Sequence, residues 1–206
     1  MATRARILDA AERVFSLHGF DGASLRNIAD ECGEHVGLVH HHSGGKEALF
    51  HQTVARRAKE LSAARLSALA RAKASSPLNL HSLFRAFFGP YMELSQTGPQ
   101  WLAYARLIAH VSADPRWRHI AADCFDPTAG IFLDEISEVL PQTQRSVIAT
   151  NFVFSVSAML AVFTSQWRVD VLGKTKRANQ NSSDSEKQLD HLIQYCAAGF
   201  LATTDL

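Results

Sequence analysis

The residues of this 206-residue chain that most directly suggest chemistry are the three consecutive histidines His40–His42. Two metal ligands on one helix usually stand at positions i and i+4, whereas adjacent residues point about 100° apart, so this run does not predict a metal site. No GxSxG or HExxH motif is present, and Gly44–Lys46 is followed by Glu47 rather than by the Ser or Thr of a phosphate-binding loop. We therefore expect no enzymatic activity, no metal ion and no cofactor.

The segment that carries these histidines predicts two short helices joined by a glycine-containing turn. Ser24 is a good N-cap for an amphipathic helix that ends at Gly33, and a second short helix follows over Val36–His42. Two short helices that cross at such a turn form a helix-turn-helix, whose second helix enters the major groove of DNA. Many helical proteins contain this turn for structural reasons alone, so on this evidence a plain helical bundle remains an alternative.

Composition places the chain among ordinary globular proteins. Hydrophobic residues make up 47% and charged residues 20%, which excludes a disordered polar protein. The three cysteines form no CxxC pair, which argues against a disulfide framework or zinc ribbon and favours a reducing, cytoplasmic location. The net charge is +1, but residues 1–73 hold 11 Lys and Arg against 8 Asp and Glu. This mild excess is compatible with a basic N-terminal module or with an ordinary solvated surface.

No segment predicts a membrane partner. The most apolar stretch, Val147–Phe163, is 17 residues long and is interrupted by polar side chains, whereas a membrane-spanning helix needs about 20 mostly apolar residues. We expect a buried helix there. The N-terminus runs directly into an amphipathic pattern and has no apolar stretch of the signal-peptide type.

The apolar periodicity is helical throughout and predicts an all-α chain without internal repeats. A long helix runs from Lys46 to about Lys73, Ser75–Pro77 marks the boundary after it, and polar residues predict an exposed mobile loop over Gly173–Asp184. The other helices expected after the boundary, most of them opened by a proline, are Leu78–Phe88, Pro90–Gln96, Pro99–Val111, Pro115–Leu140 with a kink or split at Asp126-Pro127, Pro141–Leu172 and Ser185–Ala202.

The N-terminal residues also resemble a known family. The pattern is carried, in order, by Ile7–Ala11, Phe15, His18–Ala29, Cys32-Gly33, Gly37, His42 and Lys46–Phe50. This stretch is similar to the DNA-binding domain of TetR-type transcriptional regulators. The resemblance implies an all-α fold with a three-helix helix-turn-helix domain over residues 1–50, a connecting helix over 51–76, and a helical ligand-binding and dimerisation domain over 77–206.

The resemblance implies that the first domain binds a double-stranded DNA operator. The Ser24 hydroxyl would cap its helix and contact a phosphate, and Lys46 would lie near the sugar-phosphate backbone, contacts that position a protein without reading sequence. We expect His42 to pack into the three-helix core while His40 and His41 face DNA. The residues predicted to contact DNA are Arg4, Ser24, Arg26, His35, Val36, Gly37, Leu38, His40, His41 and Lys46.

The second short helix departs from the family pattern. His35 replaces the usual capping serine, Leu38 and His40 replace phosphate-binding hydroxyls, and Ser43 replaces a buried phenylalanine. Glu34 adds a negative charge that phosphates would repel. Fewer hydroxyl donors and this charge should weaken DNA binding.

The C-terminal half resembles, more weakly, a fatty-acid-responsive subgroup of the family through Phe87–Pro90, Trp101–Ala109 and Phe125–Pro127. Aromatic and methionine side chains suit an apolar cavity in which a few polar groups orient a ligand, although a plain helical core explains the same residues. The resemblance implies a small hydrophobic effector, either acyl or aromatic. The residues predicted to bind it are Phe87, Phe88, Met92, Trp101, Tyr104, Arg106, Ile108, Phe125, Asn151, Phe152, Met159 and Phe163.

A homodimer is expected because one helix-turn-helix contacts few bases, whereas two modules about 34–36 Å apart read a palindrome. The helices over Pro141–Leu172 and Ser185–Ala202 could pair with those of a partner in a four-helix bundle, or they could close the monomer's own core. We expect the chain to be a repressor that an effector releases from DNA. The alternative is a small-molecule-binding dimer whose DNA binding is weakened or lost. The predicted interface residues are Phe154, Ser155, Ala158, Ala161, Leu189, Leu192, Ile193, Cys196 and Phe200.

Overall fold

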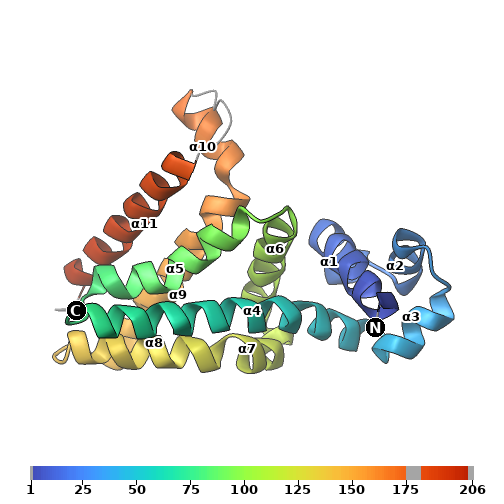
Figure 1. Ribbon diagram of the computed structural model, residues 1–206, viewed down its shortest axis with the longest axis horizontal. Helices are drawn as coiled ribbons and strands as arrows, with labels where there is room; N and C mark the ends of the chain where they lie inside the picture. The colour runs from blue at the N-terminus through green and yellow to red at the C-terminus, as the bar shows by residue number, and fades with distance from the viewer. Residues whose placement is uncertain (1, 175–181, 204–206) are drawn as a thin grey trace. The chain divides into compact units, whose positions relative to one another are not determined.

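The computed structural model describes residues 2–174 and 182–203, and every regular element in these ranges is helical (Figure 1). The predicted all-α fold with an N-terminal helix-turn-helix is therefore confirmed. The elements are α1 (Ala2–Gly22), α2 (Leu25–Cys32), α3 (Val36–Ser43), α4 (Lys46–Ser75), α5 (Leu80–Ser95), α6 (Gln100–Ala113), the 3-10 turn η1 (Pro115–Trp117), α7 (Arg118–Cys124), α8 (Asp126–Val139), α9 (Arg145–Thr164), α10 (Gln166–Gly173) and α11 (Ser182–Ala202).

The chain divides into two compact units. Unit 1 comprises Met1–Glu60 and Gly98–Asp126, and unit 2 comprises Leu61–Thr97 and Pro127–Leu206. The helices α1, α2 and α3 thus share a unit with α6, η1 and α7, which lie far along the sequence. This division describes packing, whereas the functional boundaries at residues 50 and 76 stay a prediction.

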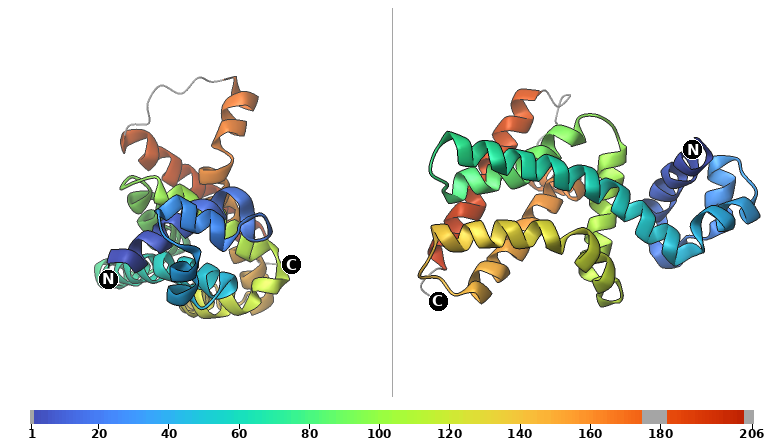
Figure 2. Two further views of the ribbon diagram at one scale, coloured as in Figure 1. Left: turned by 90° about the vertical axis from the view of Figure 1, so that its right-hand side faces the viewer. Right: turned by 60° about the horizontal axis from the view of Figure 1, so that its bottom comes forward.

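Aromatic side chains form the core of unit 1. Phe15 of α1 and Phe50 of α4 are buried, with ring centroids 5.0 Å apart. Phe20 packs against Phe50 at 5.5 Å and against Trp117 of η1 at 4.6 Å. Each such pair adds about 0.5–1.5 kcal/mol to the free energy gained by burial. Figure 2 shows α1, α2 and α3, in blue, grouped beside the first turns of α4.

Ion pairs fix α1 against α2 and α4. Glu12 is buried and accepts hydrogen bonds from Arg56 at 2.5 Å and from Arg57 at 3.1 Å. Arg13 pairs with Glu31 of α2 at 2.7 Å. Because the Glu12 carboxylate is 2% exposed, loss of its arginine partners would leave a buried charge unpaired, a change that costs about 3–5 kcal/mol. The orientation of α1 is therefore held by charge as well as by apolar packing.

The core of unit 2 is built on α5. Phe84 and Phe88 stack with centroids 5.2 Å apart, and Phe200 of α11 packs against Phe84 at 5.3 Å. The helices α5 and α11 pack against each other. The alternative that α11 closes the core of its own chain therefore holds for one face of that helix.

Pro90 does not open a helix as predicted but lies inside α5, which runs without a break over Leu80–Ser95. A proline inside a helix removes one backbone hydrogen bond. The neighbouring side chains of Phe87, Tyr91 and Met92 are all buried, so a continuous helix keeps this apolar run in the core. Packing outweighs the local preference of the proline.

Three other predicted boundaries also changed. The segment expected over Pro115–Leu140 forms η1, α7 and α8, and its second division falls at the predicted Asp126-Pro127. The segment expected to open at Pro141 starts at Arg145 and is divided at Ser165 into α9 and α10. The predicted loop lies mostly outside the described residues, and α11 already begins at Ser182.

The helix α9 is buried on one face only, so the prediction of a buried helix is half correct. By length and composition alone its residues Arg145–Thr164 could cross a membrane, and 33% of its apolar window is buried inside the chain. Ile148 and Met159 face the core, whereas Val153 and Phe154 are 61% and 66% exposed. A single apolar helix of this kind is weak evidence for a membrane, and the exposed face is equally suited to a protein partner.

Candidate nucleic-acid interface

The helices α2 and α3 are held by a local geometry that the sequence anticipates. Ser24 is extended, with φ −135°, and its Oγ accepts a hydrogen bond from the Asn27 N–H at 3.1 Å. Gly33 adopts the left-handed conformation with φ 68°, which favours glycine, and ends α2. The predicted cap and turn are both present. They set α3 against α2 as in a helix-turn-helix.

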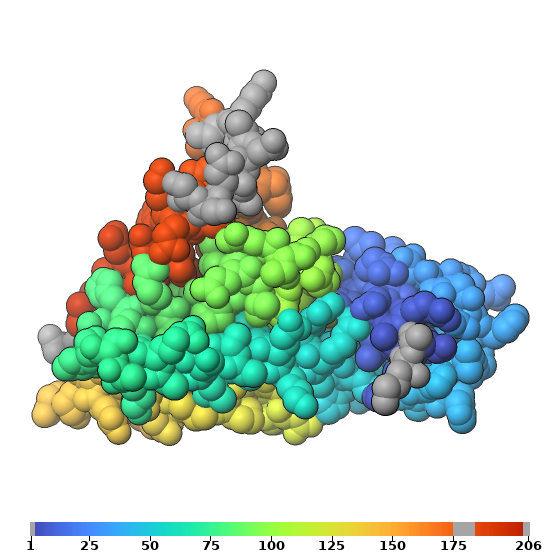
Figure 3. All heavy atoms as spheres, viewed as in Figure 1, coloured from blue at the N-terminus to red at the C-terminus, as the bar shows by residue number. Residues whose placement is uncertain are grey.

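The helix α3 presents an exposed face that consists of Val36, Gly37 and the side chains of three histidines. Val39 and Ser43 point into the core, and Val36 is 49% exposed. His40, His41 and His42 are all exposed, so the prediction that His42 packs into the core is wrong. The reason is that Ser43 occupies the inward position, and its neighbour His42 points about 100° away on the helix. Figure 3 shows that this part of the chain, in blue, is at the surface.

Cationic side chains accompany this face. Arg26 is exposed, Arg4 donates to the side-chain Oε1 of Gln52 at 3.2 Å, and the Lys46 ammonium lies 4.3 Å from the centre of the Phe20 ring. These residues belong to α1, α2 and the start of α4, which share unit 1 with α3. A helix in a groove flanked by cations is the general arrangement for binding a duplex.

Of the predicted weaknesses of this interface, the structure shows one at His35 and compensates another at Glu34. His35 precedes α3 at the N-cap position but makes no side-chain capping bond. Glu34 forms an ion pair with Arg6 of α1, so its negative charge is compensated by a neighbour. The expected repulsion of phosphate by Glu34 is thereby reduced.

Arg116 connects η1 with the end of α1. Its guanidinium donates to Asp21 and to Asp114, each at 2.8 Å. These hydrogen bonds hold the pKa of both carboxyls below their ordinary value. The contact adds a polar link to the Phe20–Trp117 packing within unit 1.

The residues predicted to bind an effector are divided between the two units. Trp101, Tyr104, Arg106, Ile108 and Phe125 belong to unit 1, whereas Phe87, Phe88, Met92, Asn151, Phe152, Met159 and Phe163 belong to unit 2. In unit 2, the ring of Phe87 lies 5.8 Å from Phe88 and 5.0 Å from Phe152. Asn151 donates to the Thr203 hydroxyl at 2.7 Å and so binds the end of α11. Phe87, Phe88 and Phe152 thus form a buried aromatic cluster.

Sequence reasoning missed Arg65 in this cluster. Its guanidinium lies 3.6 Å from the centre of the Phe87 ring and contacts Met159. A signal was present, because Leu61 and Leu69 are buried four residues to either side, and positions four apart share one helix face. A charged residue in the middle of an apolar stripe predicts a buried polar contact.

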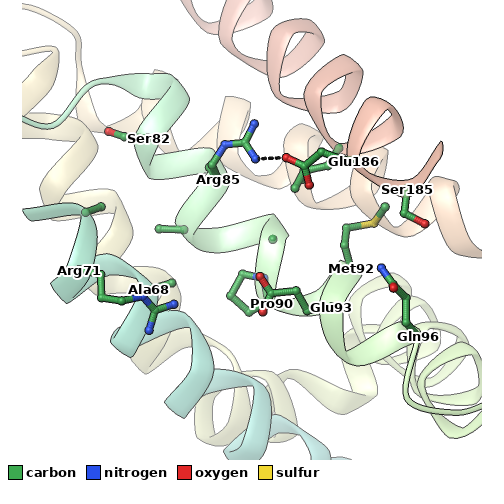
Figure 4. Close-up of a pocket in the computed structure, with 14 residues that line it drawn as sticks. Ala68, Arg71, Ser82, Arg85, Pro90, Met92, Glu93, Gln96, Ser185 and Glu186 are labelled. Atoms are coloured by element: carbon green, nitrogen blue, oxygen red, sulfur yellow. Dashed lines mark hydrogen bonds and ion pairs between the residues drawn. The ribbon is translucent and has the colours of Figure 1, made fainter. Parts of the chain in front are cut away.

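A groove of about 440 Å³ opens beside this cluster in unit 2. Small residues of α4 and α5 line it together with charged side chains of α4, α5 and α11 (Figure 4). Arg85 reaches Glu186 of α11 at 2.6 Å, while Arg71 comes from α4 and bonds the Ser67 hydroxyl. Of the residues predicted to bind an effector, Met92 lines this groove.

The predicted dimer residues are partly buried in their own chain. Leu189, Leu192, Ile193, Cys196 and Phe200 are at most 7% exposed, because this stripe of α11 packs inward. Their contact with a partner stays a prediction. Two grooves of about 950 and 730 Å³ lie between α9, α10 and α11, and Ala158 and Tyr195 line both. The surface open to a partner comprises Val153, Phe154, Ala158, Ala161, Tyr195 and Leu201.

Comparison with known proteins gives matches along the chain. Residues 7–53 match the bacterial regulatory proteins of the tetR family, and residues 85–199 match the tetracyclin repressor-like C-terminal domain. The HTH-type transcriptional repressor AcnR of Corynebacterium efficiens is 42% identical over 48 residues, which are 23% of this chain and 26% of that protein. The match thus covers about a quarter of the length of this relative.

Solved structures resemble nearly the whole chain. The fatty acid degradation regulator FadR from Bacillus halodurans aligns with a TM-score of 0.67 at 11% identity, covering 97% of this chain and 96% of FadR. The multidrug binding protein EbrR, solved in complex with malachite green, aligns with a TM-score of 0.59 at 18% identity and covers 94% and 96% of the two chains. At these identities the likeness shows a common fold.

Proposed function

This chain belongs to the TetR family of bacterial regulatory proteins, and we propose that it is a cytoplasmic repressor that binds a palindromic operator as a homodimer and is released by a small hydrophobic effector. The observation that carries the proposal is the capped α2, the left-handed turn at Gly33 and the exposed face of α3. A helix of this size fits the major groove, which is about 12 Å wide.

The chemistry of α3 suggests how the operator would be read. Val36 can contact a thymine methyl group, and imidazoles of His40 and His41 can donate to or accept from base edges. The flanking Arg4, Arg26 and Lys46 side chains would then neutralise phosphates. Since α3 itself carries no Lys or Arg, the affinity would depend mainly on these flanking cations.

Dimerisation is supported by the apolar surface of α9 and α11. Phe154 and Tyr195 are 66% and 69% exposed although both are large and aromatic. Contiguous exposed patches of this kind mark interaction sites. A second copy that presents the same surface would form the symmetric contact that most homodimers use.

Effector binding is supported by the aromatic cluster of unit 2 and by the two similar folds. The neighbour EbrR is described as a multidrug binding protein and FadR as a fatty acid degradation regulator. A ligand that prefers a conformation unsuited to DNA would shift the population away from the operator complex.

A mobility shift with the DNA upstream of the chain's own gene tests the proposal. We expect a specific complex that survives excess competitor DNA and whose affinity falls steeply with salt concentration. The variant Arg26→Ala should weaken the complex. It should also lower the slope of log affinity against log salt concentration by about one, the contribution of a single phosphate contact. A small-molecule-binding dimer without DNA function would give no specific complex on any selected genomic fragment, and that result would refute the proposal.

A further inference from the structure

The groove of about 440 Å³ in unit 2 is large enough for a small molecule, since such sites usually measure about 300–1,000 Å³. Residues of α4, α5 and α11 line it, and of the residues predicted to bind an effector only Met92 is among them. Neither the aromatic cluster nor the proposed DNA interface therefore accounts for this groove.

Two opposite charges line the groove without neutralising each other. In the part of the chain that the structure describes, the Arg71 side chain of α4 bonds only the Ser67 hydroxyl, at 2.8 Å, and the Glu93 carboxylate of α5 has no hydrogen bond or ion pair. Figure 4 shows the Glu93 carboxylate turned toward the side of the groove on which Arg71 lies. The groove thus offers one cation and one anion to a ligand.

The other charged side chains of the groove are paired within the chain. Arg85 donates to Glu186 at 2.6 Å and also forms an ion pair with Asp190 (Figure 4). The positive charge of Arg85 is therefore already compensated, and Arg71 is the guanidinium that remains for an anionic group of a ligand.

The surface between the two charges is largely apolar. Ala68 and Ala72 of α4, Ala86 and Pro90 of α5 and Leu189 of α11 all line the groove. Because Pro90 has no N–H, α5 supplies no donor four residues on to the Ala86 carbonyl oxygen. A matching ligand would combine an apolar body with an anionic group and an N–H donor.

We propose that this groove binds a free aliphatic amino acid, whose carboxylate contacts Arg71 and whose ammonium group contacts Glu93, while its side chain packs on the alanines of α4 and α5. A guanidinium forms charge-assisted bonds with a carboxylate, and an amino acid carries both charges at neutral pH. The inference goes beyond the proposed function, because it adds a second ligand, of another chemical class than the hydrophobic effector.

The test compares L-leucine with two analogues that each lack one of its charges. The acid 4-methylpentanoate has no ammonium group, and 3-methylbutylamine has no carboxylate. Binding is measured by calorimetry on the full chain at pH 7. We expect leucine to bind about 10- to 100-fold more tightly than either analogue, the range of one hydrogen bond between charged groups.

Two variants assign each charge of leucine to its residue. In Arg71→Met, leucine should bind only as well as 3-methylbutylamine, because the carboxylate has lost its partner. In Glu93→Gln, leucine should bind only as well as 4-methylpentanoate, because the ammonium group has lost its partner. Arg168→Met on α10 and Glu138→Gln on α8 remove the same charges from exposed positions that do not line the groove, and these controls should keep the native ratios.

A third variant fills the groove. Ala72 is half-buried on the α4 side, so Ala72→Leu should abolish the binding of all three molecules while circular dichroism shows an intact fold. Leucine that binds no more tightly than the analogues, unchanged ratios in Arg71→Met or Glu93→Gln, or undiminished binding in folded Ala72→Leu would each overturn the inference.

The mobility shift without ligand tests the repressor separately, because the calorimetric test involves no DNA. A chain that binds its operator but shows no preference for leucine refutes the amino-acid site and leaves the repressor proposal standing. A chain that binds leucine through Arg71 and Glu93 but binds no DNA supports the site and refutes the repressor.

Discussion

Ser24 combines a structural contact with a proposed functional one. Its hydroxyl oxygen caps α2 by accepting from the Asn27 N–H, and it lies where a phosphate is expected to pass. Ser24→Ala should lower the free energy of unfolding by about 1 kcal/mol, since a helix cap is lost. Ser24→Asp should retain stability, because aspartate caps equally well, yet weaken operator binding, because its charge repels phosphate. Urea unfolding and a mobility shift measure the two effects; full DNA affinity in Ser24→Asp would refute the phosphate contact.

Cys124 gives a prediction about pH. Burial, together with the neighbouring Asp123, raises the pKa of this thiol to about 11. A raised pKa means less thiolate, so at pH 8 the reactive fraction is about one in a thousand. Alkylation by iodoacetamide should therefore be slow in the folded chain and should accelerate about tenfold per pH unit from 8 to 10. Mass spectrometry of the Cys124 peptide checks this, with urea-unfolded protein as the control. A rate that levels off below pH 9 would contradict the assigned environment.

At the scale of elements, two glycines, one in the turn between α2 and α3 and one inside α3, should respond oppositely to alanine. Gly33 has φ 68°, so Gly33→Ala strains the turn and should cost about 1 kcal/mol of stability. Gly37 lies inside α3 with open space around its Cα, and Gly37→Ala should stabilise the chain by about 0.5–1 kcal/mol. If α3 lies against bases, the same added methyl group should weaken operator binding. Thermal unfolding and DNA titration of both variants, side by side, check the pair; unchanged DNA affinity in Gly37→Ala would place this residue away from the duplex.

Local signals explain which elements could be predicted from sequence. The cap at Ser24, the turn at Gly33 and the long alanine-rich helix from Lys46 depend on neighbouring residues, and the structure reproduces them. Pro90 and His42 were placed wrongly because tertiary packing decides both. Burial of an apolar run keeps α5 continuous through the proline. On α3 the inward position is occupied by Ser43 rather than by His42.

At the scale of the whole molecule, the periodicity of apolar residues cannot predict which distant segments of the chain pack together. The packing of α1 against α6, and of Trp117 against Phe20, joins segments about a hundred residues apart within unit 1. The same limit affected α9 and α11. Their apolar stripes were visible in the sequence, but which stripe faces the chain's own core and which faces outward depends on the helices packed against them. Leu192 thus proved buried and Phe154 exposed.

The exposed surface of α9 and α11 predicts how assembly and DNA binding are coupled. Phe154→Glu places a charge in the middle of the proposed interface and should convert the dimer to a monomer at micromolar concentration, as read by light scattering. Ile131→Glu on α8, where a side chain of similar character is 41% exposed, is the matched control and should remain dimeric. Because two linked modules make the second DNA contact intramolecular, operator affinity in Phe154→Glu should fall by roughly 100-fold or more. The isolated fold should persist, since Phe154 contributes little to the core of its own chain. A Phe154→Glu chain that stays dimeric would move the interface elsewhere, and a monomer with undiminished operator affinity would separate DNA binding from dimerisation.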